Sequence, residues 1–261
     1  MIEEKDKENV LGHDLKSESS LDFYLKNGFH KVEGWCNYRI FYFLKYISDV
    51  QKTLLINGGT CEIGVHHGKF FIGLHNLTTE GEFSLAIDVF EDQHLNIDRS
   101  GKGSLQQFKT NISLFASRQE SIQIMKKDSL ALSIKDLLDM ESNIGKFRLF
   151  SIDGGHTQQH TINDFKVAEQ LVCNGGLVIV DDYLNQNWPG VGEGIARLFL
   201  LDSPRLAPFM IGASKLLFTT FAFHQEYFKL TADWVKSRSN QESFKIVSMY
   251  GYNVVSWIPT K

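Results

Sequence analysis

The sequence predicts an α/β protein built on a doubly wound, mostly parallel β-sheet. First, short apolar runs alternate with helix-period segments through the middle of the chain, which is the pattern of strands joined by crossover helices. Second, the run at 177–180 is apolar without interruption, as in strands covered by helices on both faces. Third, the chain has 261 residues, 43% of them hydrophobic and 22% charged, which is enough to bury the core of one such domain.

The N-terminal part of the chain divides into a tail and a cap. Residues 1–20 carry six acids against three bases and little apolar content, so we expect a flexible tail. Residues 21–50 are dense in aromatic side chains, and Ile40, Phe43, Leu44 and Ile47 recur at helical spacing. This spacing predicts a helix that packs on the rest of the chain. We therefore take 21–50 as an N-terminal helical cap and 51–261 as the main domain.

Strands and helices alternate through the main domain up to residue 201. Strands are expected at 60–65, 83–88, 122–125, 147–152 and 177–180, and helices at 69–77, 104–115, 130–138, 162–172 and 195–201. A strand at 215–219 and a helix at 224–234 come next. Two late runs, 244–250 and 254–258, can pair as a hairpin around Gly251. An antiparallel addition at one edge of the sheet is the economical arrangement.

Charge and hydropathy exclude several classes of protein. Lysine and arginine number 27 against 31 acids, a net charge of −4 with neutral histidines, which argues against a nucleic-acid partner. No apolar run approaches the ~20 residues of a membrane-spanning helix, and the acidic N-terminus is unlike a secretory signal. Cys36, Cys61 and Cys173 lack CxxC spacing, so we expect the reduced thiols of a cytoplasmic protein.

An acidic residue stands at the end of every strand in the alternating region. In open parallel sheets, ligands bind beyond the carboxyl ends of the strands, near the point where the strand order reverses. Carboxylates are costly to bury unpaired, so several at one edge suggest ribose hydroxyls, an ammonium group or a metal ion. The strand-end residues are Glu62, Asp88, Asp128 with Ser129, Asp153, and the pair Asp181 and Asp182.

The first strand runs into a helix through a glycine loop. Gly64 and Gly68 allow a tight turn and a close backbone approach to a ligand. The spacing is ExGxxxG rather than the GxGxxG of dinucleotide-binding folds. Asp88 lies 24 residues beyond Gly64, near the ~20 at which an acid reaches a ribose hydroxyl. The pattern favours a nucleoside ligand, with an ordinary glycine-containing βα turn as the alternative.

A second group of residues suggests a metal ion and a base. If the fourth and fifth strands are neighbours, Asp153, Asp181 and Asp182 converge with His156 beside them. Three carboxylates that close repel one another unless a cation lies among them, and all-oxygen ligands favour Mg²⁺. A hydroxyl bound to the ion becomes more acidic, and a histidine could remove its proton at neutral pH. The alternative is a turn capped by the paired aspartates beside a surface imidazole.

The chain resembles the class I S-adenosylmethionine-dependent methyltransferases in four segments. These are CEIGVHHGKF (61–70), LAIDVF (85–90), FSIDGGHTQQHTINDF (150–165) and GGLVIVDDYLNQNWPGV (175–191). With KVEGW (31–35), they are similar to the branch that contains macrolide-sugar and other natural-product O-methyltransferases. The resemblance implies a Rossmann-like, seven-stranded sheet whose last strand is antiparallel.

The resemblance also implies roles for the strand-end residues. Around the cofactor, it places Glu62, Gly64 and Gly68 at the methionine part of S-adenosylmethionine, Asp88 at the ribose hydroxyls, and Asp128 with Ser129 at the adenine. It implies Mg²⁺ ligands at Asp153, Asp181 and Asp182, and a catalytic base at His156 acting with Asp153. Catechol-type relatives have asparagine at the position of Asp182, so the acceptor here is expected to differ from a catechol.

The sequence hypothesis is therefore an S-adenosylmethionine-dependent O-methyltransferase that uses Mg²⁺ and acts on a hydroxyl of a small molecule, such as a sugar or natural product. The alternatives are a metal-independent methyltransferase, an NAD-binding oxidoreductase and a non-catalytic nucleoside-binding protein. Adjacent residues usually point apart, so His66 and His67 are expected to have a loop role rather than to bind a metal. The phenylalanines around 209–228 form either core or a subunit interface, which leaves a homo-oligomer among the expectations.

Overall fold

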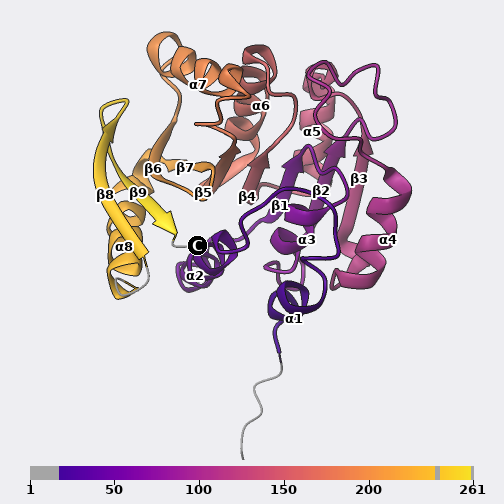
Figure 1. Cartoon of the computed structure of the whole chain (residues 1–261), viewed down its shortest axis with the longest axis horizontal. Coiled ribbons are helices and arrows are strands. Elements are labelled where there is room, and N and C mark those ends of the chain that lie inside the picture. Colours follow the sequence, from indigo (N-terminus) through magenta and orange to yellow (C-terminus); the bar gives the residue numbers. More distant parts are fainter. Residues whose placement is uncertain (1–17, 239–241, 260–261) are drawn as a thin grey trace, which may run out of the picture.

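The computed structural model describes residues 18–238 and 242–259, and these form one nine-stranded sheet between two layers of helices (Figure 1). The strands are β1 (Gly59–Ile63), β2 (Ser84–Asp88), β3 (Ile122–Lys126), β4 (Phe147–Ile152), β5 (Val172–Asp181), β6 (Leu206–Gly212), β7 (Lys215–Thr220), β8 (Glu242–Met249) and β9 (Tyr252–Pro259). The longer helices are α1 (Ser20–Asn27), α2 (Ile40–Thr53), α3 (Lys69–His75), α4 (Leu105–Phe115), α5 (Ile134–Asn143), α6 (Gln158–Leu171), α7 (Pro189–Leu201) and α8 (His224–Ser237).

The strand order is β3-β2-β1-β4-β5-β7-β6-β9-β8. Strands β1 to β5 are mutually parallel, and β7 is antiparallel to both β5 and β6. The doubly wound, mostly parallel sheet with antiparallel late strands is thus confirmed. The expected number of seven strands is wrong, because β9 continues the sheet beyond β6 and β8 pairs with β9. The sequence analysis did not predict strand β6. The first five residues of this strand are buried in the structure.

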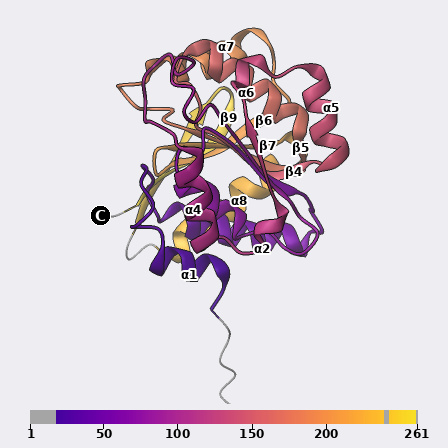
Figure 2. The ribbon, with the colours of Figure 1, turned by 90° about the vertical axis from the view of Figure 1, so that its right-hand side faces the viewer.

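An apolar core lies between each face of the sheet and its helical layer, and a third apolar cluster includes Phe108 and Ile112 of α4. Helices α2, α3 and α8 pack on one face, and α5, α6 and α7 pack on the other. Figure 2 shows the sheet with the second group on one side and α1, α2, α4 and α8 on the other. Strand β5 contributes Leu177 and Ile179 to the first core and Val178 and Val180 to the second. Cover on both faces explains why 177–180 is apolar without a break.

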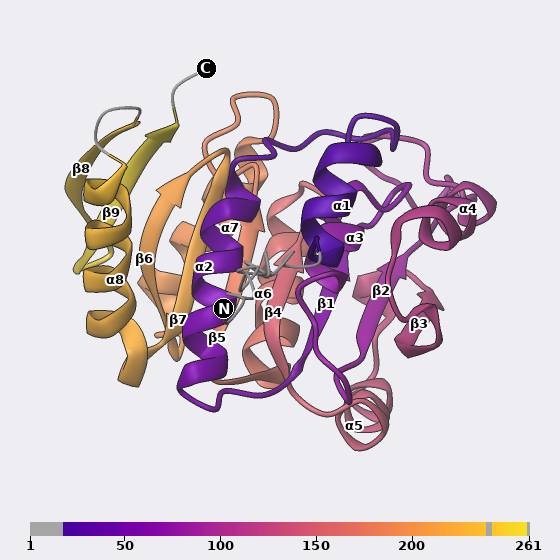
Figure 3. The ribbon, with the colours of Figure 1, turned by 90° about the horizontal axis from the view of Figure 1, so that it is seen from below.

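The N-terminal segment is two helices joined by a loop at 28–39 rather than one cap helix. Ile40, Phe43, Leu44 and Ile47 of α2 are fully buried, so the expected packing face is confirmed. Figure 3 shows α2 lying along the sheet close to β5 and β7. The cap therefore includes a helix that covers a face of the sheet. The remainder of the predicted tail, residues 1–17, lies outside the described residues.

A buried arginine attaches α2 to the sheet. Arg148 of β4 is fully buried, and its Nε lies 2.8 Å from Oε1 of Glu82. Its Nη1 donates to Ser48 and Gln51 of α2, at 3.0 Å in both cases. Because each charged and polar partner is paired, the cost of burying this group is offset.

The C-terminal hairpin forms as expected. Strands β8 and β9 pair antiparallel from Glu242↔Pro259 to Met249↔Tyr252. Tyr250 and Gly251 both have positive φ, +51° and +84°, which is the two-residue turn that matches the twist of the strands.

The phenylalanines Phe209 and Phe218 are buried in the cores of the same chain. None of the helices in the described residues has the length and hydropathy needed to cross a membrane.

Candidate active site

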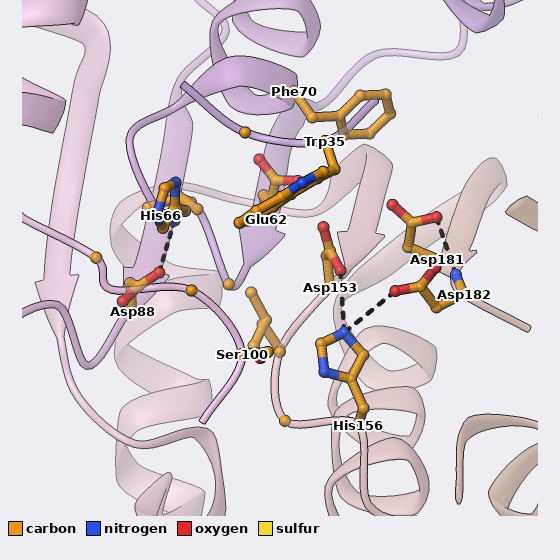
Figure 4. Close-up of a pocket in the computed structure, with 18 of the residues that line it drawn as sticks. Trp35, Glu62, His66, Phe70, Asp88, Ser100, Asp153, His156, Asp181 and Asp182 are labelled. Atoms are coloured by element: carbon orange, nitrogen blue, oxygen red, sulfur yellow. Dashed lines mark hydrogen bonds and ion pairs between the residues drawn. The ribbon is translucent and has the colours of Figure 1, made fainter. Parts of the chain in front are cut away.

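A cavity of about 600 Å³ lies at the carboxyl ends of β1, β2, β4 and β5. Lys215, the first residue of β7, also lines it. The strand order reverses between β1 and β4, so the cavity lies at the topological switch point of the sheet. Figure 4 shows His66 and Asp88 at one side of it, Asp181 and Asp182 at the other, and Glu62 and Asp153 between them. The predicted residues that line it are Glu62, Gly64, Asp88, Asp128, Ser129, Asp153, His156, Asp181 and Asp182.

The two glycines of the loop after β1 serve different contacts. Gly64 has φ +85°, and a Cβ atom there would lie 1.9 Å from the carbonyl oxygen of Asp153. Glycine is therefore required for the loops after β1 and β4 to approach each other. Gly68, the N-cap of α3, has φ +92° and packs against the ring of Phe108 instead. Gly68 is not among the residues that line the cavity.

Glu62 presents a buried carboxylate to the cavity. Its Oε1 accepts from the hydroxyl of Ser151 at 3.2 Å, while its Oε2 has no hydrogen-bond partner within the described residues. Burial, together with the nearby Asp153, raises the pKa of Glu62 well above its usual range. The free Oε2 in this position is available to a ligand that brings donors or positive charge.

Asp88 holds the glycine loop in place while it faces the cavity. Its Oδ2 accepts from the backbone N–H of His66 at 2.8 Å, and its Oδ1 accepts from that of Phe90 at 2.5 Å. Burial raises the pKa of Asp88 despite these bonds. Each carboxylate oxygen has two lone pairs, so Asp88 can still accept from two ligand hydroxyls.

Asp128 and Ser129 lie together after β3. Asp128 caps a short 3₁₀ helix by accepting from the N–H of Leu130 at 3.0 Å. Ser129 is buried, and its carbonyl accepts from Asn163 at 2.9 Å. This places an acceptor and a small side chain on the part of the cavity wall expected to contact adenine.

His156 is fixed by an aspartate that the sequence analysis did not identify. Oδ2 of Asp98 lies 2.8 Å from Nδ1 of His156 and also accepts from the backbone N–H of His156 at 2.6 Å. The ring stacks on Trp188, with centroids 4.4 Å apart and planes 18° apart. These contacts favour the tautomer with hydrogen on Nδ1, which leaves Nε2 on the side of Asp153 and Asp182.

Asp153 and Asp182 converge on Nε2 of His156. The nearest carboxylate oxygens lie 3.6 Å and 3.4 Å from it, respectively (Figure 4). Burial alone would lower the pKa of His156, but Asp153, Asp182 and Asp98 outweigh it and raise that pKa to about 11. In this arrangement the imidazolium of His156 is the counter-ion of the Asp153 and Asp182 carboxylates.

Asp181 is buried and bonded to a different cation. Its Oδ2 accepts from Nζ of Lys215, the residue opposite it in the β5–β7 pairing. Lys215 is fully buried and also lies over the ring of Phe70, 4.2 Å from its centroid. Burial opposes the charge of Lys215, but Asp181 and its neighbours keep the pKa of the ammonium above its usual range.

The donors present fit a divalent cation with two carboxylate ligands. One atom from each of Asp153, His156 and Asp182 lies within 4.8 Å of the others. Mg²⁺ is commonly held by one or two carboxylates together with water and substrate oxygens. The structure thus brings together two of the three predicted ligands, Asp153 and Asp182, and pairs the third, Asp181, with Lys215.

The sequence analysis did not identify two of these contacts, those of Asp98 and Lys215. Asp98 lies in the long loop between β2 and α4, and loop geometry, which has no periodicity, brings it to His156. For Lys215 a signal existed, because it is a single lysine that opens an otherwise apolar and hydroxyl-bearing strand. A charged residue that begins a buried strand at the ligand-binding edge is unusual.

The sequence and the fold are similar to those of known proteins. Residues 61–183 match the model of a family described as a methyltransferase domain. The uncharacterized protein R132 of Acanthamoeba polyphaga mimivirus is 35% identical over 101 residues, which span 37% of this chain. The match covers 45% of that viral protein, so the chain spans less than half the length of this curated relative.

Solved structures share the fold at low sequence identity. The O-methyltransferase NovP aligns with a TM-score of 0.58 at 14% identity, over 70% of this chain and 80% of that one. The O-methyltransferase from Bacillus cereus in complex with SAH aligns with a TM-score of 0.50 at 17% identity, over 79% of this chain and 92% of that one. At this level of identity, both matches show a shared fold.

Proposed function

We propose that this protein, whose residues 61–183 match a methyltransferase domain, is an S-adenosylmethionine-dependent methyltransferase that transfers the methyl group to a hydroxyl of a small molecule. The observation that carries the proposal is one cavity, in which the glycine loop and its acidic neighbours meet the group of Asp98, His156, Asp153 and Asp182. The two solved structures with this fold named above are O-methyltransferases, which supports oxygen as the acceptor atom.

The cofactor is proposed to bind along the β1–β3 side of the cavity. Asp88 would accept from the ribose hydroxyls, and Asp128 would accept from the amino group of adenine beside Ser129. Glu62, whose Oε2 has no hydrogen-bond partner within the described residues, lies on the cavity wall between Asp88 and Asp153. It is available to the ammonium of the methionine part, which would supply the missing partner.

Methyl transfer requires alignment and removal of one proton. The sulfonium is a good electrophile, so the protein must hold the acceptor oxygen, the methyl carbon and the sulfur in line. His156 is proposed as the base, because Asp98 fixes Nδ1 and leaves Nε2 facing Asp153 and Asp182. No nucleophilic side chain is needed.

We further propose that Asp153 and Asp182 hold Mg²⁺, with Asp181 beside them. When bound, this ion would orient the acceptor hydroxyl and make it more acidic. It would also balance the charge that the imidazolium of His156 otherwise balances, and a neutral His156 is the form that can accept a proton. Asp182 adopts φ +57°, a strained conformation for a residue other than glycine that often accompanies a functional site.

A metal-independent methyltransferase is the second candidate. Lys215 already balances Asp181, and His156 already balances Asp153 and Asp182. In that mechanism these residues would only position the acceptor.

The cavity volume of about 600 Å³ is within the range of small-molecule sites, and Trp35 and Trp188 on its wall suit a sugar or a planar natural product.

The experiment has a binding part and a turnover part. Calorimetry with S-adenosylmethionine or its demethylated product is expected to give one site per chain. With a panel of hydroxylated sugars and polyketides, methyl transfer is expected to stop in excess EDTA and to return with added Mg²⁺. Full turnover in EDTA would favour the metal-independent candidate, and failure to bind either cofactor form would contradict the proposed function.

A further inference from the structure

A second cluster of metal-ligating side chains lies on the wall of the same cavity, which Glu33 and His66 both line, and His66 is on the side away from Asp181 and Asp182. Glu33, His66 and His67 each offer one ligand atom, and these atoms lie within 4.8 Å of one another. Glu33 comes from the loop between α1 and α2, and the histidines follow β1. The expectation that the two imidazoles point apart is wrong, because their rings stack with centroids 3.9 Å apart and planes 27° apart.

The backbone of His66 explains why the two rings lie on the same side. His66 has φ +50°, in the left-handed region, which few residues other than glycine adopt, although histidine enters it more readily than most. The bond from its N–H to Asp88, 2.8 Å long, holds it there (Figure 4). In an extended backbone successive side chains alternate between opposite sides, and the left-handed residue breaks that alternation.

Three of the four ring nitrogens of His66 and His67 are buried without a hydrogen bond within the described residues, whereas the His66 ring also has a hydrogen bond with the backbone of Glu33. His67 is 8% exposed, and neither of its ring nitrogens makes a hydrogen bond within the described residues. Nδ1 of His66 is also buried without one. The nearest acidic atom is Oε2 of Glu33, 3.2 Å from Nδ1 of His67. Buried polar atoms without a partner are destabilising, so a ligand that supplies partners to these nitrogens would be favoured.

We propose that Glu33, His66 and His67 bind a divalent transition-metal ion, for which Zn²⁺ is the best chemical match. Two imidazoles and one carboxylate, completed by water, form a common donor set for Zn²⁺ and its neighbours in the first transition series. The same set does not suit Mg²⁺, which takes oxygen ligands. This site is therefore chemically distinct from the carboxylates Asp153 and Asp182.

Binding requires a small adjustment of the rings. Stacked imidazoles direct their lone pairs side by side, so one ring must turn for both nitrogens to reach one ion. The lack of hydrogen bonds on His67 and on Nδ1 of His66 removes a major cost of that turn. The ion would then tie the loop of Glu33 to the loop after β1, close to Trp35, whose ring lies 5.6 Å from that of His66.

The test measures metal binding directly, on the full chain without a polyhistidine tag and after removal of metals by a chelator. Zn²⁺ is titrated in competition with a chromogenic chelator, and Co²⁺ is titrated while its visible absorption is recorded. We expect the unmodified chain to bind with an affinity that falls at least tenfold in both Glu33→Gln and His67→Gln. Glu33 is exposed, so its variant is expected to fold even if that of His67 does not.

The matched control is the double variant Asp153→Asn with Asp182→Asn, which removes the acidic group and leaves this cluster intact. It is expected to keep the Zn²⁺ affinity of the unmodified chain. Unchanged affinity in Glu33→Gln and His67→Gln, loss of affinity only in the control, or no binding at all would each overturn the proposal. None of these measurements depends on methyl transfer, so the result is separate from the fate of the proposed function.

Discussion

Oδ2 of Asp98 lies 2.8 Å from Nδ1 of His156, although 58 positions separate the two residues in the chain. The same oxygen accepts from the backbone N–H of His156. Burial alone would raise the pKa of Asp98, but these bonds hold it below its usual range, so Asp98 is ionised at neutral pH. An ionised carboxylate on Nδ1 determines both the orientation and the tautomer of the imidazole.

Asp98→Asn is expected to lower kcat by about 10- to 100-fold, the usual effect of losing a residue that orients a functional histidine. The amide can present its oxygen or its NH₂ group to Nδ1, and the latter favours the tautomer with the hydrogen on Nε2. The measurement is steady-state methyl transfer together with calorimetry of cofactor binding, which we expect to be nearly unchanged. The control is Asp92→Asn, in the same loop but paired with Lys126. Equal losses in both variants would contradict a positioning role for Asp98.

His156→Gln is expected to reduce kcat by at least about 100-fold, because general acid–base catalysis contributes 10²–10⁴-fold. Glutamine keeps a polar side chain beside Trp188 but cannot accept the proton. The affinity for the demethylated cofactor is expected to change little, since Asp88, the proposed ribose ligand, lies on the other side of the cavity. A variant with full turnover would remove His156 from the role of base.

The pair of Lys215 and Asp181 gives a prediction about stability. Lys215→Met leaves Asp181 buried without a partner, and Asp181→Asn leaves a buried ammonium. Each change is expected to lower the free energy of unfolding by about 3–5 kcal/mol. The double variant has no uncompensated charge, so its loss is expected to be smaller than the sum of the two. Urea unfolding of the four proteins measures this coupling, and strictly additive losses would show that the pair does not interact.

Buried His75 is expected to make the free energy of unfolding depend on pH. Its Nδ1 lies 2.7 Å from the hydroxyl of Ser84, and burial lowers its pKa to about 4. The unfolded chain, with a pKa of ~6.5, therefore binds more protons between pH 6.5 and pH 4, and stability falls as the pH falls through that window. From pH 7 to pH 5 this group is expected to remove about 2 kcal/mol.

The measurement for His75 is a difference between two variants, because other groups also titrate in that window. His75→Gln is expected to lose about 2 kcal/mol less than the unmodified chain between pH 7 and pH 5. His94→Gln, at an exposed position, is expected to follow the unmodified chain. If all three unfolding curves shift together with pH, His75 is not the source of the acid sensitivity.

The central fold was predictable because its signals are local. The alternation of apolar runs with helix-period segments identified β1 to β5, and each strand end carried its acid. The loop contacts were not predictable in this way. Asp98 reaches His156 from a loop, and the stacked histidines depend on one left-handed residue, His66, that carries no sequence signal like that of glycine. Strand β6 has a weak sequence signal, because Pro208 lies within it and proline is typical of edge strands and bulges.

Substitution of Gly64 is the sharpest test of the geometry of the cavity. At this position the cost of the backbone conformation can be measured separately from the cost of the steric clash. Gly64 and Gly81 have nearly the same φ, +85° and +83°, so alanine at either position pays a similar conformational cost of about 1–2 kcal/mol. A Cβ at Gly81 meets no atom within 4 Å, whereas a Cβ at Gly64 would lie 1.9 Å from the carbonyl oxygen of Asp153.

Gly64→Ala is therefore expected to be clearly more destabilising than Gly81→Ala, because the loops after β1 and β4 must separate to admit the methyl group. That separation moves Asp153 relative to Glu62, so cofactor affinity is also expected to fall in Gly64→Ala and to stay unchanged in Gly81→Ala. Thermal unfolding and calorimetry of the two variants measure both effects. Equal stability and equal affinity would mean that the two loops do not meet at the switch point, and the cavity would then have a different shape from the one that supports the proposed function.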